Sequence, residues 1–204
     1  NGTVDVEVSM DKKNSYAAND HIELSSWLFV DTNTFTLQQG ETKKVHYKIQ
    51  TSTSMVGNIS GQVSFTTKPP GNEMMRAKMT LPIYVNIRGT EVVDFKVLDV
   101  KLGQYFGKTL GTLSIKNNGN IHVMPMGYFS VNRGKKVLYA GTIRQSLVVF
   151  AGTTRSDFDF QIPEGIKFDP GKYKMNISVK AKDKESKKTI NVRVNQDGSM
   201  QAVK

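Results

Sequence analysis

Apolar residues recur at every second position along much of this chain, and this period of two constrains its fold more than any other feature. In the stretch AKMTLPIYVNI the apolar residues occupy alternate positions, namely Ala77, Met79, Leu81, Ile83, Val85 and Ile87. Because successive side chains of a strand point to opposite faces, the pattern predicts a long strand from Met74 to Arg88. Shorter stretches such as HIELSSWLFV and KKVHYKIQ follow the same rule, separated by turn sequences such as NNGN, NRGKK and FDPGK. Since no segment has helical spacing, we expect an all-β fold made of sandwiches or barrels.

The chain also contains an internal repeat, which predicts two domains of one kind. FTLQQGETKKVHYKI and LVVFAGTTRSDFDFQI share an apolar run, a glycine, a threonine and an alternating strand, with Gly40 and Gly152 placed 112 positions apart. NISGQVSF and FDPGKYKMNISV follow in the same order, with Gly61 and Gly171 placed 110 positions apart. We therefore expect one domain at residues 1–88 and a second at 89–204, joined near Gly89.

A third repeated pair, NGTVDVEV at Asn1 and NGNIHVMP at Asn118, indicates that the two copies differ in length. In the second copy, the residues between Gly89 and Asn118 suffice for two strands, VVDFKVLDVKL and LGTLSIKN, which have no counterpart in the first copy. The first domain is therefore expected to lack its first strands. Two explanations remain open: these strands precede Asn1 in a longer protein, or the domain takes a strand from a partner.

The sequence offers few groups for catalysis. It has no cysteine, and its three histidines, His21, His46 and His122, lack the spacing of a metal site. The motif GQYFGKT, which begins at Gly103, has three residues between its glycines, whereas a phosphate loop needs four and a following helix. We therefore expect no enzymatic activity, no cofactor and no metal.

The chain is basic, with 28 Lys and Arg residues against 18 Asp and Glu residues and a formal net charge of +10. Aromatic and basic residues do not alternate as they do on a nucleic-acid-binding surface, so we expect no nucleic-acid partner. The densest basic run, KAKDKESKK, contains five lysines, namely Lys180, Lys182, Lys184, Lys187 and Lys188. We expect a solvated hairpin tip here; the alternative is a surface that binds lipid head groups or wall polymers.

The long strand is the best candidate for a binding site. Pro82 has no amide hydrogen, so it fits an edge strand or a bulge better than the centre of a sheet. An edge strand can extend a partner's sheet while its apolar side chains fill the partner's pockets. The candidate residues are Ala77, Met79, Leu81, Ile83 and Val85, with Arg76 and Lys78 as the nearest basic residues. The alternative is a strand whose apolar face packs on the core of its own domain.

The motifs FTLQQGETKKVHYKI, GNISGQVSF and LPIYVNIRG, in this order, resemble the immunoglobulin-like first domain of periplasmic pilus-assembly chaperones. IKNNGNIHVMPMGYFSV, VVFAGTTRSDFDF and FDPGKYKMNISV resemble immunoglobulin-like repeats of bacterial envelope proteins. The resemblance implies two tandem immunoglobulin-like β-sandwich domains in the periplasm. It also implies that Ala77 to Ile87 donate alternating apolar residues to an incomplete pilin. The family holds the pilin's terminal carboxylate with two basic residues; one belongs to the missing first strand, and the other falls near Pro82, where neither Arg76 nor Lys78 is a secure match.

MVGNISGQVSF and DPGKYKMNISVKA are also similar to Gram-positive cell-surface proteins that interact with WxL-domain partners and join two immunoglobulin-like domains. Both resemblances imply a non-catalytic protein of the bacterial envelope, periplasmic or at the cell surface, that acts by binding. The first favours a chaperone-like protein that engages a pilin-like or surface subunit by edge-strand addition. The second favours an adhesin or wall-binding module that binds peptidoglycan or an anionic surface polymer.

Overall fold

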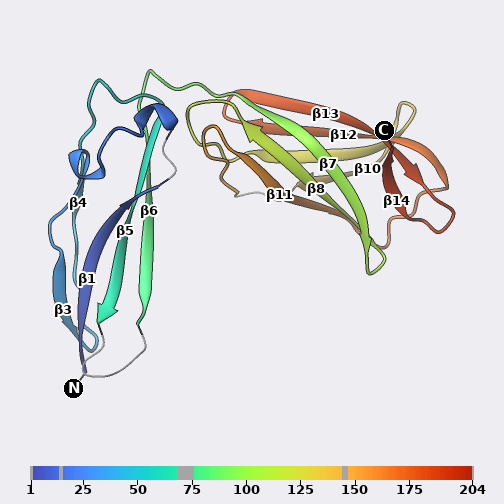
Figure 1. Cartoon of the computed structure of the whole chain (residues 1–204). Helices are drawn as coiled ribbons and strands as arrows, with labels where there is room; N and C mark the ends of the chain where they lie inside the picture. The colour runs from blue at the N-terminus through green and yellow to red at the C-terminus, as the bar shows by residue number, and fades with distance from the viewer. Residues whose placement is uncertain (1, 14–15, 69–75, 144–146, 204) are drawn as a thin grey trace. The chain divides into compact units, whose positions relative to one another are not determined.

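The computed structural model describes residues 2–13, 16–68, 76–143 and 147–203, and nearly all of its regular structure is β-strand (Figure 1). The chain divides into two compact units, unit 1 (Asn1–Glu91) and unit 2 (Val92–Lys204). The division lies close to Gly89, where the repeat predicts a joint. Among the described residues, no helix is long and apolar enough to cross a membrane.

Unit 1 is a two-layer sandwich whose layers differ in size. Its strands are β1 (Thr3–Lys12), β2 (Leu28–Val30), β3 (Thr34–Gln38), β4 (Tyr47–Ile49), β5 (Asn58–Lys68) and β6 (Lys78–Asn86). One layer is an antiparallel sheet in the order β3-β1-β5-β6, and the other is the pair β2-β4. Trp27 and Leu28 from the thin layer pack between the sheets against Ile59, Val63 and Ile83. A Cβ on Gly61 would lie 2.8 Å from Leu24 Cδ1, so the layers approach closely at this end.

Unit 2 is a larger sandwich with two extended layers. Its strands are β7 (Phe95–Tyr105), β8 (Lys108–Asn117), β9 (Met126–Arg133), β10 (Lys136–Ile143), β11 (Thr154–Ile162), β12 (Gly171–Ala181), β13 (Lys184–Val194) and β14 (Met200–Val203). The sheet β10-β9-β12-β13-β14 packs on the sheet β11-β8-β7. At the centre, the rings of Phe129 and Phe160 lie 4.4 Å apart, and Phe160 crosses Gly111, where a Cβ would overlap its ring. The predicted fold class, tandem immunoglobulin-like β-sandwiches, is confirmed.

The larger sheets of the two units share one strand order. The order β3-β1-β5-β6 in unit 1 parallels β10-β9-β12-β13 in unit 2, and every neighbouring pair is antiparallel. The second layers differ: β11 of unit 2 pairs along its length with β8, whereas β4 of unit 1 pairs over three residues with β2. Among the described residues, the strand beside β4 is therefore only three residues long, and part of the inner sheet face of unit 1 is left uncovered.

Two sequence expectations differ from the structure. HIELSSWLFV forms a short 3-10 helix, η2 (Leu24–Ser26), before the three-residue strand β2, because Trp27 and Leu28 both turn into the core. NGNIHVMP does not form a strand equivalent to β1; it precedes β9 as an irregular segment that buries Ile121 and Val123. Its backbone is held by the buried Asn117 amide, which donates to the carbonyl oxygens of Ile121 (2.8 Å) and Val149 (3.0 Å).

Candidate functional site

Strand β6 lies at the edge of the larger sheet of unit 1 (Figure 1). It pairs with β5 in an unbroken antiparallel register from Asn58↔Asn86 to Thr66↔Lys78. In the part of the chain that the structure describes, it pairs with no other strand. The predicted strand from Met74 to Arg88 is shorter in the structure, and Met74 lies outside the described residues.

The hydrogen bonds at the two ends of β6 show which of its backbone groups face the free edge. Thr67 N donates to Ala77 O (2.9 Å), and Ile87 N donates to Gly57 O (2.7 Å). Since the direction of bonding alternates along an antiparallel strand, odd-numbered residues from 77 to 87 bond to β5 and even-numbered residues point outward. Pro82 occupies an outward position, so it removes no bond from the sheet and one donor from the edge.

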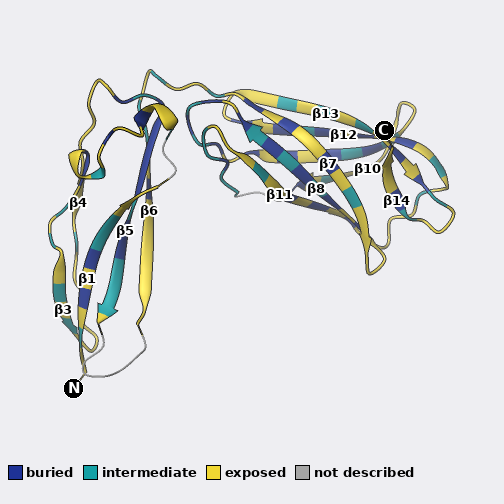
Figure 2. Cartoon of the chain, in the orientation of Figure 1, coloured by how far each residue is buried: buried dark blue, intermediate teal, exposed yellow. Residues whose placement is uncertain are grey.

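The predicted partner-binding residues share the inner face of the sheet, but their exposure changes along the strand (Figure 2). Ile83 is buried in the core, and Val85 is half-buried. Leu81 is 46% exposed and Met79 is 67% exposed, and Ala77, just before the strand, is also exposed. The reason is the thin second layer, which covers the Ile83 end and stops short of Met79. The strand therefore closes the core at one end and presents apolar side chains at the other.

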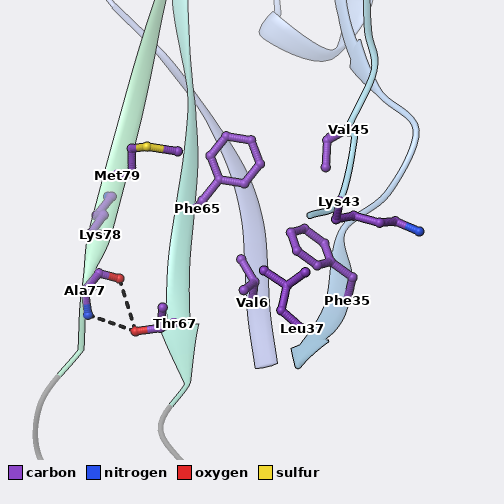
Figure 3. A pocket seen from close by; sticks show the side chains of 10 residues that line it. All are labelled: Val6, Phe35, Leu37, Lys43, Val45, Phe65, Thr67, Ala77, Lys78 and Met79. Carbon is purple, nitrogen blue, oxygen red and sulfur yellow. Dashed lines mark hydrogen bonds between the residues drawn. The ribbon is translucent and has the colours of Figure 1, made fainter. Parts of the chain in front are cut away.

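An open groove of about 510 Å³ lies beside the exposed half of β6 (Figure 3). Side chains from five segments line it, namely Val6, Phe35, Leu37, Lys43, Val45, Phe65, Thr67, Ala77, Lys78 and Met79. Phe35 and Phe65 are only half-buried, so aromatic surface remains accessible to a ligand. Lys43 and Lys78 are the charged members of this lining, and both are exposed. Arg76, also exposed, precedes the strand and does not line the groove.

Of the predicted partner-binding residues, Ala77 and Met79 line the groove, whereas the sequence does not point to the groove residues outside β6. Val6 pairs across β1 and β3 with Phe35, and Phe65 pairs across β5 and β6 with Met79. These pairings join residues that are far apart in sequence, so only the sheet order brings them together. The alternation around Val6 and Phe65 marks an apolar face, but it does not reveal which end of that face stays uncovered.

The five lysines of KAKDKESKK do not form one basic cluster. They lie in the β12–β13 hairpin, as expected. Lys180 and Lys187 flank Glu185, with Nζ to carboxylate distances of 3.9 and 3.0 Å. A hydrogen bond from Ser178 and the nearby Lys187 lower the pKa of Glu185. Lys188 Nζ donates to Leu98 O (2.8 Å), whereas Lys182 and Lys184 flank Asp183 at the hairpin turn.

The formal net charge of the chain comes from unit 2. Unit 1 contains nine Lys and Arg residues and nine Asp and Glu residues, whereas unit 2 contains nineteen and nine. The formal net charge of +10 therefore belongs entirely to unit 2, while unit 1 with its groove is neutral. The two units thus offer different chemistry to partners: an apolar edge in unit 1 and a cationic surface in unit 2.

Titratable groups do not gather into a reactive centre in the described part of the chain. No three His, Cys, Asp or Glu side chains there are placed to hold a metal ion. His46 Nδ1 lies 2.9 Å from Asp31 Oδ2, and this hydrogen bond lowers the pKa of the Asp31 carboxyl. His122 lies in unit 2, where burial and the charge of Lys182 lower its pKa.

No protein-family model and no curated protein matches this sequence. Solved structures that are similar to the chain include a chain from a chaperone–tip adhesin complex in CFA/I fimbriae biogenesis, at 9% identity and a TM-score of 0.48. That similarity covers 92% of this chain and 85% of the other. The YadV chaperone is similar at 8% identity and a TM-score of 0.45, with coverage of 94% and 86%. The similar structures thus include a chaperone and a chain from a complex that contains one.

Proposed function

We propose that this protein is a chaperone-like binding protein of the bacterial envelope, which holds an extended segment or an incomplete subunit of a partner along β6. The observation that carries the proposal is the pair Met79 and Leu81, two large apolar side chains exposed on an edge strand. Such residues on a free edge invite pairing with another chain unless the protein uses them. The proposed partner is a pilin-like or other surface subunit, and the proposed compartment is the periplasm or the cell surface.

The backbone and the side chains of β6 supply different parts of the binding. Outward-facing backbone groups at Lys78, Thr80 and Asn86 can extend a sheet by main-chain hydrogen bonds, which are insensitive to the partner's sequence. Met79 and Leu81 then lose their exposure to water, and burial of each stabilises the complex by roughly 1 kcal/mol, since each is already partly covered. Affinity therefore comes from both terms, and specificity from the apolar positions.

The test is a Met79→Asp, Leu81→Asp double variant, assayed for capture of a pilin-type domain that lacks one strand. Both side chains are exposed, so the substitutions should leave the fold intact while placing two charges where the partner buries apolar groups. We expect capture, measured by co-elution in size-exclusion chromatography, to fall by at least about a hundredfold.

Hydrogen exchange provides the positional readout. If a strand adds to β6, the amides of Lys78, Thr80 and Asn86 should gain protection on binding, whereas that of Met79, which bonds to β5, should change little. A Tyr128→Ser variant, which removes a half-exposed aromatic side chain from unit 2, is the matched control. Capture retained by the double variant, or binding without protection of these three amides, would contradict the proposal.

A further inference from the structure

The turn between β7 and β8 carries two exposed aromatic residues. Tyr105 is 61% exposed and Phe106 is 81% exposed, and their rings meet edge to face with centroids 4.5 Å apart. Figure 1 shows this turn at one end of unit 2, projecting from the sandwich. No other large hydrophobic residue in the described part of the chain is as exposed as Phe106.

The backbone of this turn gives no reason for a phenylalanine. Tyr105 pairs with Lys108 across a two-residue turn in which Phe106 has φ +44° and Gly107 has φ +72°. Positive φ at both central positions defines a type I′ turn, which favours Asn-Gly because a bulky side chain in the left-handed region is strained. Phe106 therefore adds strain to the turn and exposes its ring, and neither effect stabilises the fold.

Other loops continue this surface across the same end of unit 2. One pocket joins Gln104 and Gly107 of the β7–β8 turn to Ile166 and Lys167, and a second joins Ile166 and Lys167 to the β9–β10 hairpin. The loops carry these cations: Lys108, Arg133, Lys135, Lys136 and Lys167. They also carry three carboxylates, Glu164, Asp169 and Asp197, of which Asp169 lies 3.8 Å from Arg133. The surface is thus apolar at its tip and carries an excess of two cations around it.

We propose that this end of unit 2 docks on an anionic lipid bilayer, with Phe106 and Tyr105 inserted into the interface and the surrounding lysines against the head groups. A projecting aromatic tip suits a soft surface, in which tyrosine and phenylalanine bury their rings at head-group depth. The net charge of +10 on unit 2 supplies the attraction, since cations near an anionic membrane each strengthen binding. This site shares no residue with β6 and goes beyond the proposed function.

The test is sedimentation of the full chain with phosphatidylglycerol–phosphatidylcholine vesicles, with pure phosphatidylcholine vesicles for comparison. Phe106→Asn installs the residue that a type I′ turn prefers, so it should keep the hairpin folded while removing the inserted ring. We expect partition to fall by at least about tenfold for Phe106→Asn. A Lys136→Gln, Lys167→Gln double variant should lower partition by about tenfold, and added salt should do the same.

Three further variants make the outcome decisive. Phe106→Trp should keep binding and show quenching of its fluorescence by brominated lipids, beyond that of the buried Trp27. Tyr128→Ser, on the outward face of β9, and Met79→Asp, Leu81→Asp, on unit 1, should bind vesicles as the natural chain does. The proposal is overturned if Phe106→Asn partitions to vesicles as the natural chain does, or if Tyr128→Ser loses as much binding as Phe106→Asn. It is also overturned if soluble polyphosphate competes fully with the vesicles.

Discussion

At the scale of single residues, buried polar side chains hold the irregular segments in place. The sequence does not distinguish these buried side chains from exposed ones of the same type. Asn19 is fully buried, and its amide donates to Val56 O (2.6 Å) and Asn58 O (2.9 Å). Asn117 holds the segment before β9 in the same way. Because Asn is common in exposed turns, NNGN predicts a turn correctly but gives no sign that its first residue is in the core.

His122 should make unit 2 sensitive to mild acid. Burial and the charge of Lys182 hold its pKa below the usual 6.5, so the unfolded chain binds a proton more readily than the folded chain. Stability is therefore complete above about pH 6.5 and declines as the pH falls through the lowered pKa. We expect the urea midpoint of unit 2, followed by circular dichroism, to fall between pH 7.5 and pH 5.5.

A His122→Gln variant provides the control for this prediction. It should remove most of the decline between pH 7.5 and pH 5.5, because the lowered pKa values of Glu185 and Asp197 begin from 4.5 and 3.8 and act at lower pH. An equal decline in the variant would assign the effect to other groups.

At the scale of elements, Pro82 limits what the free edge of β6 can bond. A Pro82→Thr variant restores an outward N–H in the middle of the edge without disturbing the bonds to β5. Two copies of the chain can associate through their β6 edges. One added hydrogen bond of about 1 kcal/mol should strengthen this self-association about fivefold. Sedimentation equilibrium should then show self-association at correspondingly lower protein concentration.

Thr80→Pro is the reverse change, because it removes a second outward donor. It should weaken both self-association and capture of a strand-deficient pilin-type domain. If Pro82→Thr leaves the association unchanged and Thr80→Pro does not weaken capture, the backbone edge of β6 takes no part in binding.

Period-two alternation predicts the strands that have one buried face, such as β9, β12 and β13, because in these strands the pattern and the burial coincide. It failed at HIELSSWLFV, where close packing of Trp27 and Leu28 under β5 outweighs the local pattern. It identified the apolar face of β6 but not the groove, since exposure of Met79 depends on a second layer that stops short. GQYFGKT gives no sign of the aromatic tip, because the exposure of Phe106 follows from the tight turn that the pairing of β7 with β8 creates.

At the scale of the whole molecule, the two units should differ in stability. Among the described residues, the core cluster of unit 2 contains twenty-one buried residues and that of unit 1 contains eight. Since hydrophobic burial is the main stabilising term, unit 1 should unfold first. Trp27, the single tryptophan of the chain, lies in the core of unit 1 and reports on that unit alone.

We therefore expect two transitions in the circular dichroism signal of the full chain as urea is added. The fluorescence of Trp27 should change only with the first of them. Leu113→Ala, in the core of unit 2, should shift only the later transition, by about 3 kcal/mol. A single coincident transition by both probes would mean that the two units unfold together.

If a partner strand adds to β6, Pro82 should also affect which strands can bind there. Opposite Pro82, a strand that lies along β6 finds a carbonyl acceptor but no donor, so its own carbonyl at that place stays unbonded. We therefore expect partner strands to interrupt their regular pairing opposite Pro82, either by a bulge or by turning a carbonyl toward solvent. Before and after this residue the pairing should be regular. Pro82 would then fix the pairing register of the partner strand and so determine which of its residues face Met79 and Leu81.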